Sequence, residues 1–155
     1  MISNHPAMEK NTMSTFASAL IPRTQIDWAV LYSRVMTLIG LQGLLTVVVY
    51  WVKGPGTTIA DMPLGIQIDF AHGWIHLIPG FIGAYLGWTR HPYALPYVQG
   101  FGLFYLTLAV LGTFTDIHFG LQLEFNENAL HWVLGGWAAI IGFGPLLLPR
   151  AKAEA

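Results

Sequence analysis

The sequence contains no cysteine and few charged residues. The absence of cysteine among its 155 residues excludes disulfides, thiolate metal sites, iron–sulfur clusters and covalently attached c-type haem. Only 10% of the residues are charged, and without a basic run we expect no binding to nucleic acid. No nucleophile beside a base and no phosphate-binding glycine loop is found, which favours a protein without catalytic activity of its own.

Apolar residues dominate the sequence instead, at 54% of the chain. Four apolar stretches are each about 18 to 20 residues long, enough to cross roughly 30 Å of hydrocarbon as a helix. They cover residues 35–52, 70–88, 97–115 and 129–148. The sequence therefore predicts an all-α membrane protein, a bundle of four transmembrane helices in a lipid bilayer.

The distribution of basic residues predicts how the chain is oriented. Six of the seven lie before the first span, between the second and third spans, or after the fourth: Lys10, Arg23, Arg34, Arg90, Arg150 and Lys152. Because Lys and Arg are retained on the cytoplasmic side, we expect both termini in the cytoplasm.

Three regions follow from this topology. Residues 1–34 are predicted to form a cytoplasmic tail and an amphipathic segment that lies at the interface or extends the first span. Residues 35–148 form the transmembrane domain, and residues 149–155 a second cytoplasmic tail. The first twenty residues lack the apolar core of a signal peptide, so we expect no cleavage there.

Residues 64–88 are repeated, with small changes, at 119–143. The segment from Leu64 to Phe70 matches the segment from Phe119 to Phe125, and His76 then aligns with His131. We interpret this as two parallel helical hairpins, about 35–88 and 97–148, related by a pseudo-two-fold axis along the membrane normal. In this arrangement, His76 and His131 lie at the same depth and face each other.

Each of the two repeated spans carries ionisable residues and then small residues on one face. His72, His76 and Gly80 are spaced by four residues in the second span. Glu127, His131 and Gly135 have the same spacing in the fourth span. This spacing places each set on one helix face, where small residues either let helices approach closely or leave room for a flat ligand.

Three interpretations of these faces compete. In the first, the histidines are structural and hydrogen-bond across the axis or to loop carboxylates. In the second, His76 and His131 are axial ligands of a tetrapyrrole, haem b or a chlorophyll-type pigment, whose ring lies against Gly80 and Gly135. In the third, a divalent metal such as zinc or iron is bound by His72, His76, Glu127 and His131. Ion or solute passage and quinone binding complete the alternatives.

Other polar residues in or near the spans have simpler interpretations. Gln42 and Gln99 stand at repeat-related places within apolar spans, which favours hydrogen bonds between helices. Asp69, Asn126 and Asn128 stand where helix N-caps are expected.

The motifs in the second and fourth spans also resemble those of a known family. The stretch from His72 to Gly80 reads H-G-W-I-H-L-I-P-G, and the stretch from Glu127 to His131 reads E-N-A-L-H. They are similar to H-N-x-x-H-L-x-x-G and D-N-x-L-H in a family of small bacterial and cyanobacterial four-helix membrane proteins of unknown function. The resemblance spans about 62 to 145 and implies fold and topology. It also leads us to expect the bundle in a bacterial inner membrane, plasma or photosynthetic. Here Gly73 stands in place of the family's Asn, and Glu127 in place of its Asp.

A looser likeness to DoxX-like four-helix proteins adds a suggestion of redox chemistry. The main functional prediction is nevertheless a non-catalytic accessory or assembly-supporting subunit of a larger membrane complex, photosynthetic or respiratory. Its alternative is a membrane redox protein that binds b-type haem or a metal through His76 and His131.

Overall fold

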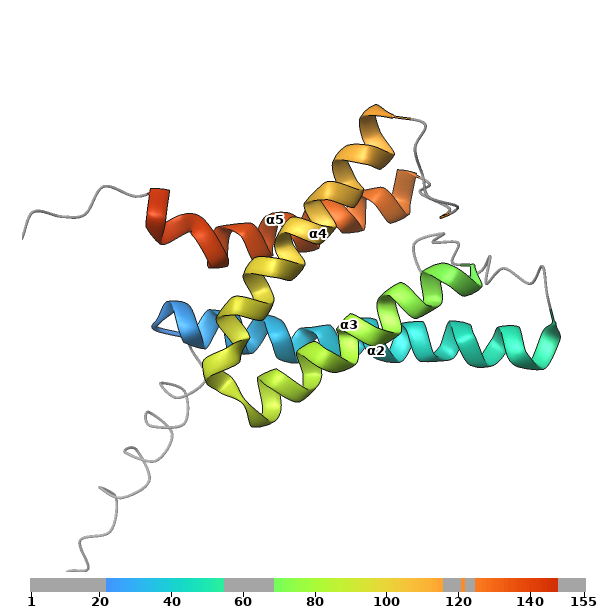
Figure 1. Ribbon diagram of the computed structural model, residues 1–155, viewed down its shortest axis with the longest axis horizontal. Helices are drawn as coiled ribbons and strands as arrows, with labels where there is room; N and C mark the ends of the chain where they lie inside the picture. Colours follow the sequence, from blue (N-terminus) through green and yellow to red (C-terminus); the bar gives the residue numbers. More distant parts are fainter. Residues whose placement is uncertain (1–21, 55–68, 116–120, 122–124, 148–155) are drawn as a thin grey trace, which may run out of the picture.

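The computed structural model describes residues 22–54, 69–115, 121 and 125–147, and in these residues all regular structure is helical (Figure 1). The elements are α2 (Gln25–Lys53), α3 (Phe70–Thr89), the short 3₁₀ helix η2 (His91–Tyr93), α4 (Ala94–Phe114) and α5 (Phe125–Leu147). Each predicted apolar span coincides with most of one α-helix. The all-helical prediction is therefore confirmed for the described residues.

Helix α2 is longer than the predicted first span because it begins at a strong N-terminal signal. The Thr24 side chain accepts a hydrogen bond from the backbone N–H of Asp27, and the Asp27 carboxylate accepts one from the backbone N–H of Thr24. This capping box starts a continuous helix of 29 residues. From Gln25 onward, the amphipathic segment is thus an extension of the first span; residues 1–21 lie outside the described part.

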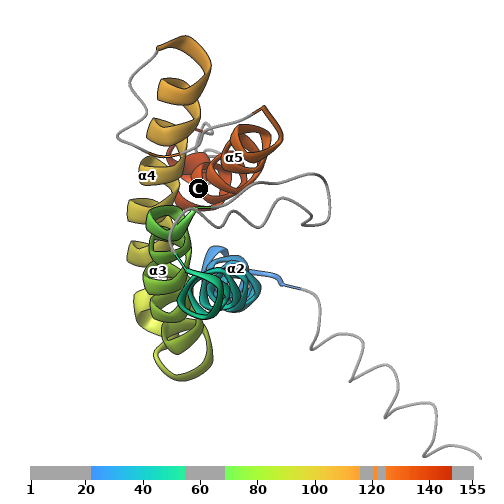
Figure 2. The ribbon, with the colours of Figure 1, turned by 90° about the vertical axis from the view of Figure 1, so that its right-hand side faces the viewer.

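The helices form two antiparallel hairpins, α2 with α3 and α4 with α5 (Figures 1 and 2). In the first hairpin, Gly40 and Gly80 meet backbone to backbone: a Cβ atom added to Gly40 would lie 3.0 Å from the carbonyl carbon of Gly80. In the second hairpin, Gly102 lies against Ala138, 2.9 Å from its Cβ on the same construction. Small residues thus set the close approach within each hairpin.

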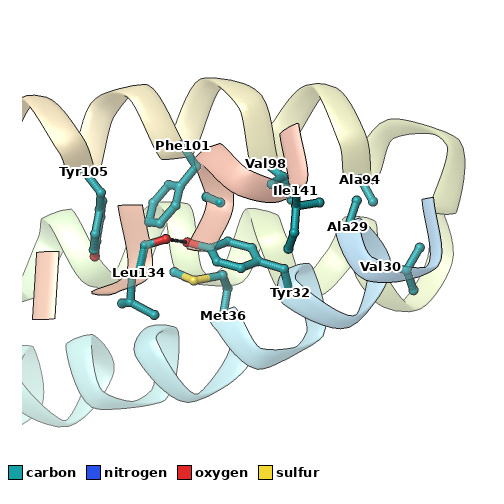
Figure 3. Close-up of a cluster of buried hydrophobic side chains, with 11 residues drawn as sticks. Ala29, Val30, Tyr32, Met36, Ala94, Val98, Phe101, Tyr105, Leu134 and Ile141 are labelled. Atoms are coloured by element: carbon teal, nitrogen blue, oxygen red, sulfur yellow. Dashed lines mark hydrogen bonds between the residues drawn. The ribbon is translucent and has the colours of Figure 1, made fainter. Parts of the chain in front are cut away.

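A buried apolar cluster joins the two hairpins (Figure 3). It is built mainly from α2, α4 and α5, and its largest members are Tyr32, Met36, Phe101 and Tyr105. The Tyr32 hydroxyl donates a 3.1 Å hydrogen bond to the carbonyl of Leu134, which satisfies a buried polar group while linking α2 to α5. The cluster fixes α5 relative to the first hairpin.

Within the described residues, three helical segments are long and apolar enough to cross a membrane: Gln25–Lys53, His91–Phe114 and Asn128–Leu146. Helix α3 has 20 residues, which is sufficient length, but it carries two histidines that lower its mean hydropathy. Large apolar side chains are exposed along the helices, among them Leu38 at 66% and Ile140 at 71%. The apolar helices indicate a lipid environment.

Candidate functional site

Three histidines from the two hairpins meet in the interior of the bundle. His72 and His76 come from consecutive turns of α3, and His131 comes from α5. All three side chains are completely buried, and one ring nitrogen from each lies within 4.8 Å of the others. The ring centroids of His76 and His131 are 6.4 Å apart, so the predicted approach of these two residues is found.

The ring of His72 completes a triangle with the rings of His76 and His131. Its ring centroid is 4.6 Å from that of His76, with the planes almost perpendicular, and 5.5 Å from that of His131, with the planes nearly parallel. The three imidazoles therefore form one cluster, which we call the histidine triad (His72, His76 and His131).

Local sequence explains why α3 presents its two histidines here. The Asp69 carboxylate accepts a 2.7 Å hydrogen bond from the backbone N–H of His72, which confirms the predicted N-cap and starts the helix just before the triad. A four-residue step then places His76 on the same face. Gly73 lies between them, against the Thr46 side chain, and lets α2 approach this turn closely.

A chain of hydrogen bonds from α2 orients the ring of His76. The Thr46 hydroxyl donates to the backbone carbonyl of Gln42, and the Gln42 amide nitrogen donates to the Thr46 hydroxyl oxygen at 3.2 Å. This leaves Oε1 of Gln42 to accept a 2.5 Å hydrogen bond from Nδ1–H of His76. With its proton on Nδ1, the imidazole of His76 directs an unprotonated Nε2 into the triad.

The triad contains buried nitrogens that the protein leaves without hydrogen bonds. Nε2 of His76 and both ring nitrogens of His131 have no hydrogen-bond partner among the described residues. Buried polar atoms are nearly always paired, and in membrane interiors an unpaired group is costly. These nitrogens therefore point to an occupant other than the side chains of the described residues.

The glycines predicted to line a flat ligand lie in the helix contacts instead. Gly80 packs against Gly40 and the carbonyl of Met36 on α2, and Gly135 packs against Tyr105 and Leu106 on α4. The α3 and α5 faces below the histidines are thus covered within their own hairpins. Glu127, the fourth predicted metal ligand, lies in the first turn of α5, but its side chain is outside the described part of the structure.

The two mid-span glutamines both bond across helices, as the sequence predicts, but at different heights. Gln42 bonds to His76 in the triad, whereas the Gln99 amide donates a 2.9 Å hydrogen bond to the carbonyl of Gly142, eleven residues beyond His131. The hairpins therefore pack in different registers, and Gln99 does not support His131.

The predicted N-cap role of Asn128 is wrong. Helix α5 begins at Phe125, so Asn128 lies inside it, and its amide nitrogen donates to the Ala109 carbonyl at 3.1 Å and to the Thr113 hydroxyl at 2.8 Å. Asn128 holds α5 to α4 one turn before His131. Asn128 can make these hydrogen bonds because α5 starts before the apolar run and so includes Asn128.

Tyr105 is the residue at the triad that sequence reasoning missed. Its ring lies edge-on to His131, with 5.0 Å between centroids, and also 6.3 Å from the ring of His76. The signal available in the sequence was a tyrosine at the centre of an otherwise apolar span, where a hydroxyl needs a specific environment.

Comparison with known proteins does not assign a role to the histidine triad. Comparison with protein-family models, with curated proteins and with solved structures finds no match for this chain. The resemblance to the four-helix family therefore stays a prediction, and the function has to be argued from the triad itself.

Proposed function

We propose that this chain is a small multi-pass membrane protein that holds a single transition-metal ion between its two hairpins, with His72, His76 and His131 as ligands. The observation that carries the proposal is the meeting of three buried imidazoles whose nitrogens lie within 4.8 Å of one another. Neutral imidazole is the commonest nitrogen ligand of transition metals in proteins, and ligand sites in bundles form from facing helices in this way.

The geometry supports a bound ion after only a small contraction. Metal–nitrogen bonds of about 2.0 Å place three nitrogens roughly 3.3 to 3.5 Å from one another. Binding would therefore draw together nitrogens that already lie within 4.8 Å of one another. The Gln42 amide already holds His76 in the tautomer that a metal ligand needs, as hydrogen bonds to the second ring nitrogen do in known metal sites.

The same geometry favours an ion over a tetrapyrrole. A macrocycle held between His76 and His131 needs a slot free of side chains, but the ring of His72 lies 4.6 Å from one of them and 5.5 Å from the other. Gly80 and Gly135, which would have to line that slot, are in contact with α2 and α4. A haem or a chlorophyll would have to displace the ring of His72 and separate Gly80 and Gly135 from the helices they contact.

We further propose that all four helices cross the inner membrane of a bacterium and that the hairpins descend from one duplicated unit. The duplication at 64–88 and 119–143 supports this, as does the direction of the helices, which alternates along the chain (Figure 1). Arg23 and Arg90 flank the end at which α2 begins and α3 ends, which is consistent with a cytoplasmic location for that end.

The metal content of the purified full chain tests the proposal. We expect elemental analysis of protein in mild detergent, after incubation with transition-metal salts and desalting, to give one ion per chain. His131→Ala removes the single ligand from α5, and retention should fall by about 100-fold or more, since three ligands become two.

His91→Ala is the matched control, because His91 is exposed in η2 and outside the triad. It should bind metal as the unaltered protein does. If helical content is intact and neither the unaltered chain nor His91→Ala retains metal, the triad is structural and holds water at most. A Soret band that His131→Ala abolishes would replace the ion with a tetrapyrrole.

The accessory-subunit role stays a prediction. The exposed apolar side chains suit lipid as well as a protein partner, and nothing specific to one face distinguishes the two. An ion site is compatible with either role.

A further inference from the structure

The ligand set of the histidine triad carries no negative charge among the described residues. Three imidazoles form the cluster, and no described carboxylate joins it. The Asp69 carboxylate, close to it in sequence, is used as the N-cap of α3 and accepts the backbone N–H of His72. The group that contacts His76 from behind, the Gln42 amide, is also neutral. Within the described part of the chain, therefore, no group neutralises the charge of an ion bound here.

The surroundings of the triad make that charge costly. His72, His76 and His131 are each 0% exposed, and Tyr105 and the apolar cluster of α2, α4 and α5 lie beside them. The desolvation cost of an ion in a low-dielectric interior grows with the square of its charge, so a divalent ion costs about four times as much as a monovalent ion of the same size. Burial with neutral ligands favours the lower charge.

The burial of the three rings also favours a monovalent ion. A zinc ion bound by three histidines normally completes a tetrahedron with water in an open fourth position. The complete burial of all three rings leaves no solvent-facing side on which such a water exchanges. A d¹⁰ monovalent ion accepts three nitrogen ligands without a fourth.

We infer that the triad selects monovalent Cu(I) over divalent Zn(II). The inference rests on the proposed metal site and names its ion. Copper in general suits imidazole ligands, and the absence of cysteine means that nitrogen rather than thiolate donors have to hold it. Both ions have a filled d shell, so they differ in charge and in the number of ligands they take, and both differences favour Cu(I) at this site.

Competition titrations on metal-free full-length protein in mild detergent test the inference. Under anaerobic conditions, a chromophoric Cu(I) chelator competes for cuprous ion, and a chromophoric Zn(II) chelator competes for zinc in a parallel experiment. We expect one Cu(I) per chain with a dissociation constant about 100-fold or more below that for Zn(II). Silver(I), monovalent and redox-inert, should displace Cu(I); His131→Ala should lose this binding, and His91→Ala should keep it.

The outcomes separate this inference from the proposed function. Zinc bound as tightly as Cu(I), or more tightly, overturns the inference and leaves the metal site standing, whereas binding of neither ion overturns both. Glu127→Gln is the second variant: Cu(I) affinity should not change. A loss of about tenfold or more would place a carboxylate in the site and remove the charge argument.

Discussion

The two hairpins carry the same histidine at the same place, yet they support it differently. In the first hairpin, α2 directs Gln42 at His76, and Thr46 holds that amide in place. In the second hairpin, α4 presents the ring of Tyr105 to His131, whose ring nitrogens have no hydrogen-bond partner in the described part of the chain. The comparison shows that the hydrogen-bonding support of each of these histidines depends on how the neighbouring helix packs.

The packing registers account for this difference. Gly80 meets Gly40 on α2, so Gln42 is close to the turn that carries His76. Gly135, the repeat partner of Gly80, meets Tyr105 and Leu106 on α4, so Gln99 is about two turns away and bonds to Gly142 instead. Within the described residues, the first hairpin thus orients its histidine by a hydrogen bond, whereas the second holds its histidine by ring packing.

The largest contrast between the hairpins should appear when each glutamine is replaced. Gln42→Leu removes the acceptor that fixes the His76 tautomer, and we expect the affinity for the ion to fall by about 10 to 100-fold, as for other residues that orient metal ligands. Gln99→Leu is the matched variant in the other hairpin and should leave affinity unchanged. Metal competition titration measures both.

Equal losses in the two glutamine variants would mean that the amides act on overall stability, and the contrast between the hairpins would disappear. The pH dependence should also separate the variants. Imidazole must be unprotonated to bind a metal, so affinity falls toward acid in every variant, but Gln42→Leu should show the same loss of affinity even at alkaline pH.

A second contrast concerns how closely each hairpin is packed. Gly80→Ala places a Cβ atom against the backbone of Gly40, where no side chain can move away, and we expect a loss of about 3 kcal/mol in the free energy of unfolding. Gly135→Ala meets the Leu106 side chain as well as its backbone, and a smaller loss of about 1 kcal/mol is expected.

Gly100→Ala serves as the control for these glycine variants. An added Cβ atom there has nothing within 4 Å, and alanine has the higher helix propensity, so stability should rise by up to about 1 kcal/mol. Unfolding titrations with a denaturing detergent give the ranking. A ranking in which Gly135→Ala is the most harmful would place the tighter contact in the second hairpin.

The smallest effect is expected at the end where α2 begins. Pro145 lacks an N–H, so the carbonyl of Ile141 loses its helical partner, and the Gln25 side chain donates to it at 2.8 Å. Gln25→Leu should therefore cost about 0.6 kcal/mol, the average for hydrogen bonds between membrane helices, without any change in metal affinity. A change in affinity would show that this distant end is coupled to the triad.

The sequence predicts the triad well because its chemistry is local and repeated. Histidines spaced by four residues in an apolar helix share a face, and the duplication places His131 at the depth of His76. Asp69 is recognisable as an N-cap because a short polar residue directly precedes an apolar run. These inferences need only helix geometry.

What the sequence does not predict depends on packing between helices. A glycine such as Gly80 or Gly135 has the same pattern whether it admits another helix or a flat ligand, and only the contact with Gly40 or Leu106 decides. The partner of Gln42 depends on helix register, which one residue of displacement along the axis changes. Asn128 is not an N-cap because α5 begins at Phe125, before the apolar run.

X-ray absorption spectroscopy of the metal-bound full chain tests the central claim most directly, because it counts and identifies the atoms around the ion. The account predicts three imidazole nitrogens at about 2.0 Å, with the outer-shell scattering that imidazole rings produce. Coordination by oxygen alone, or by the four coplanar nitrogens of a macrocycle, would contradict the assignment of His72, His76 and His131 as the ligands of a single ion.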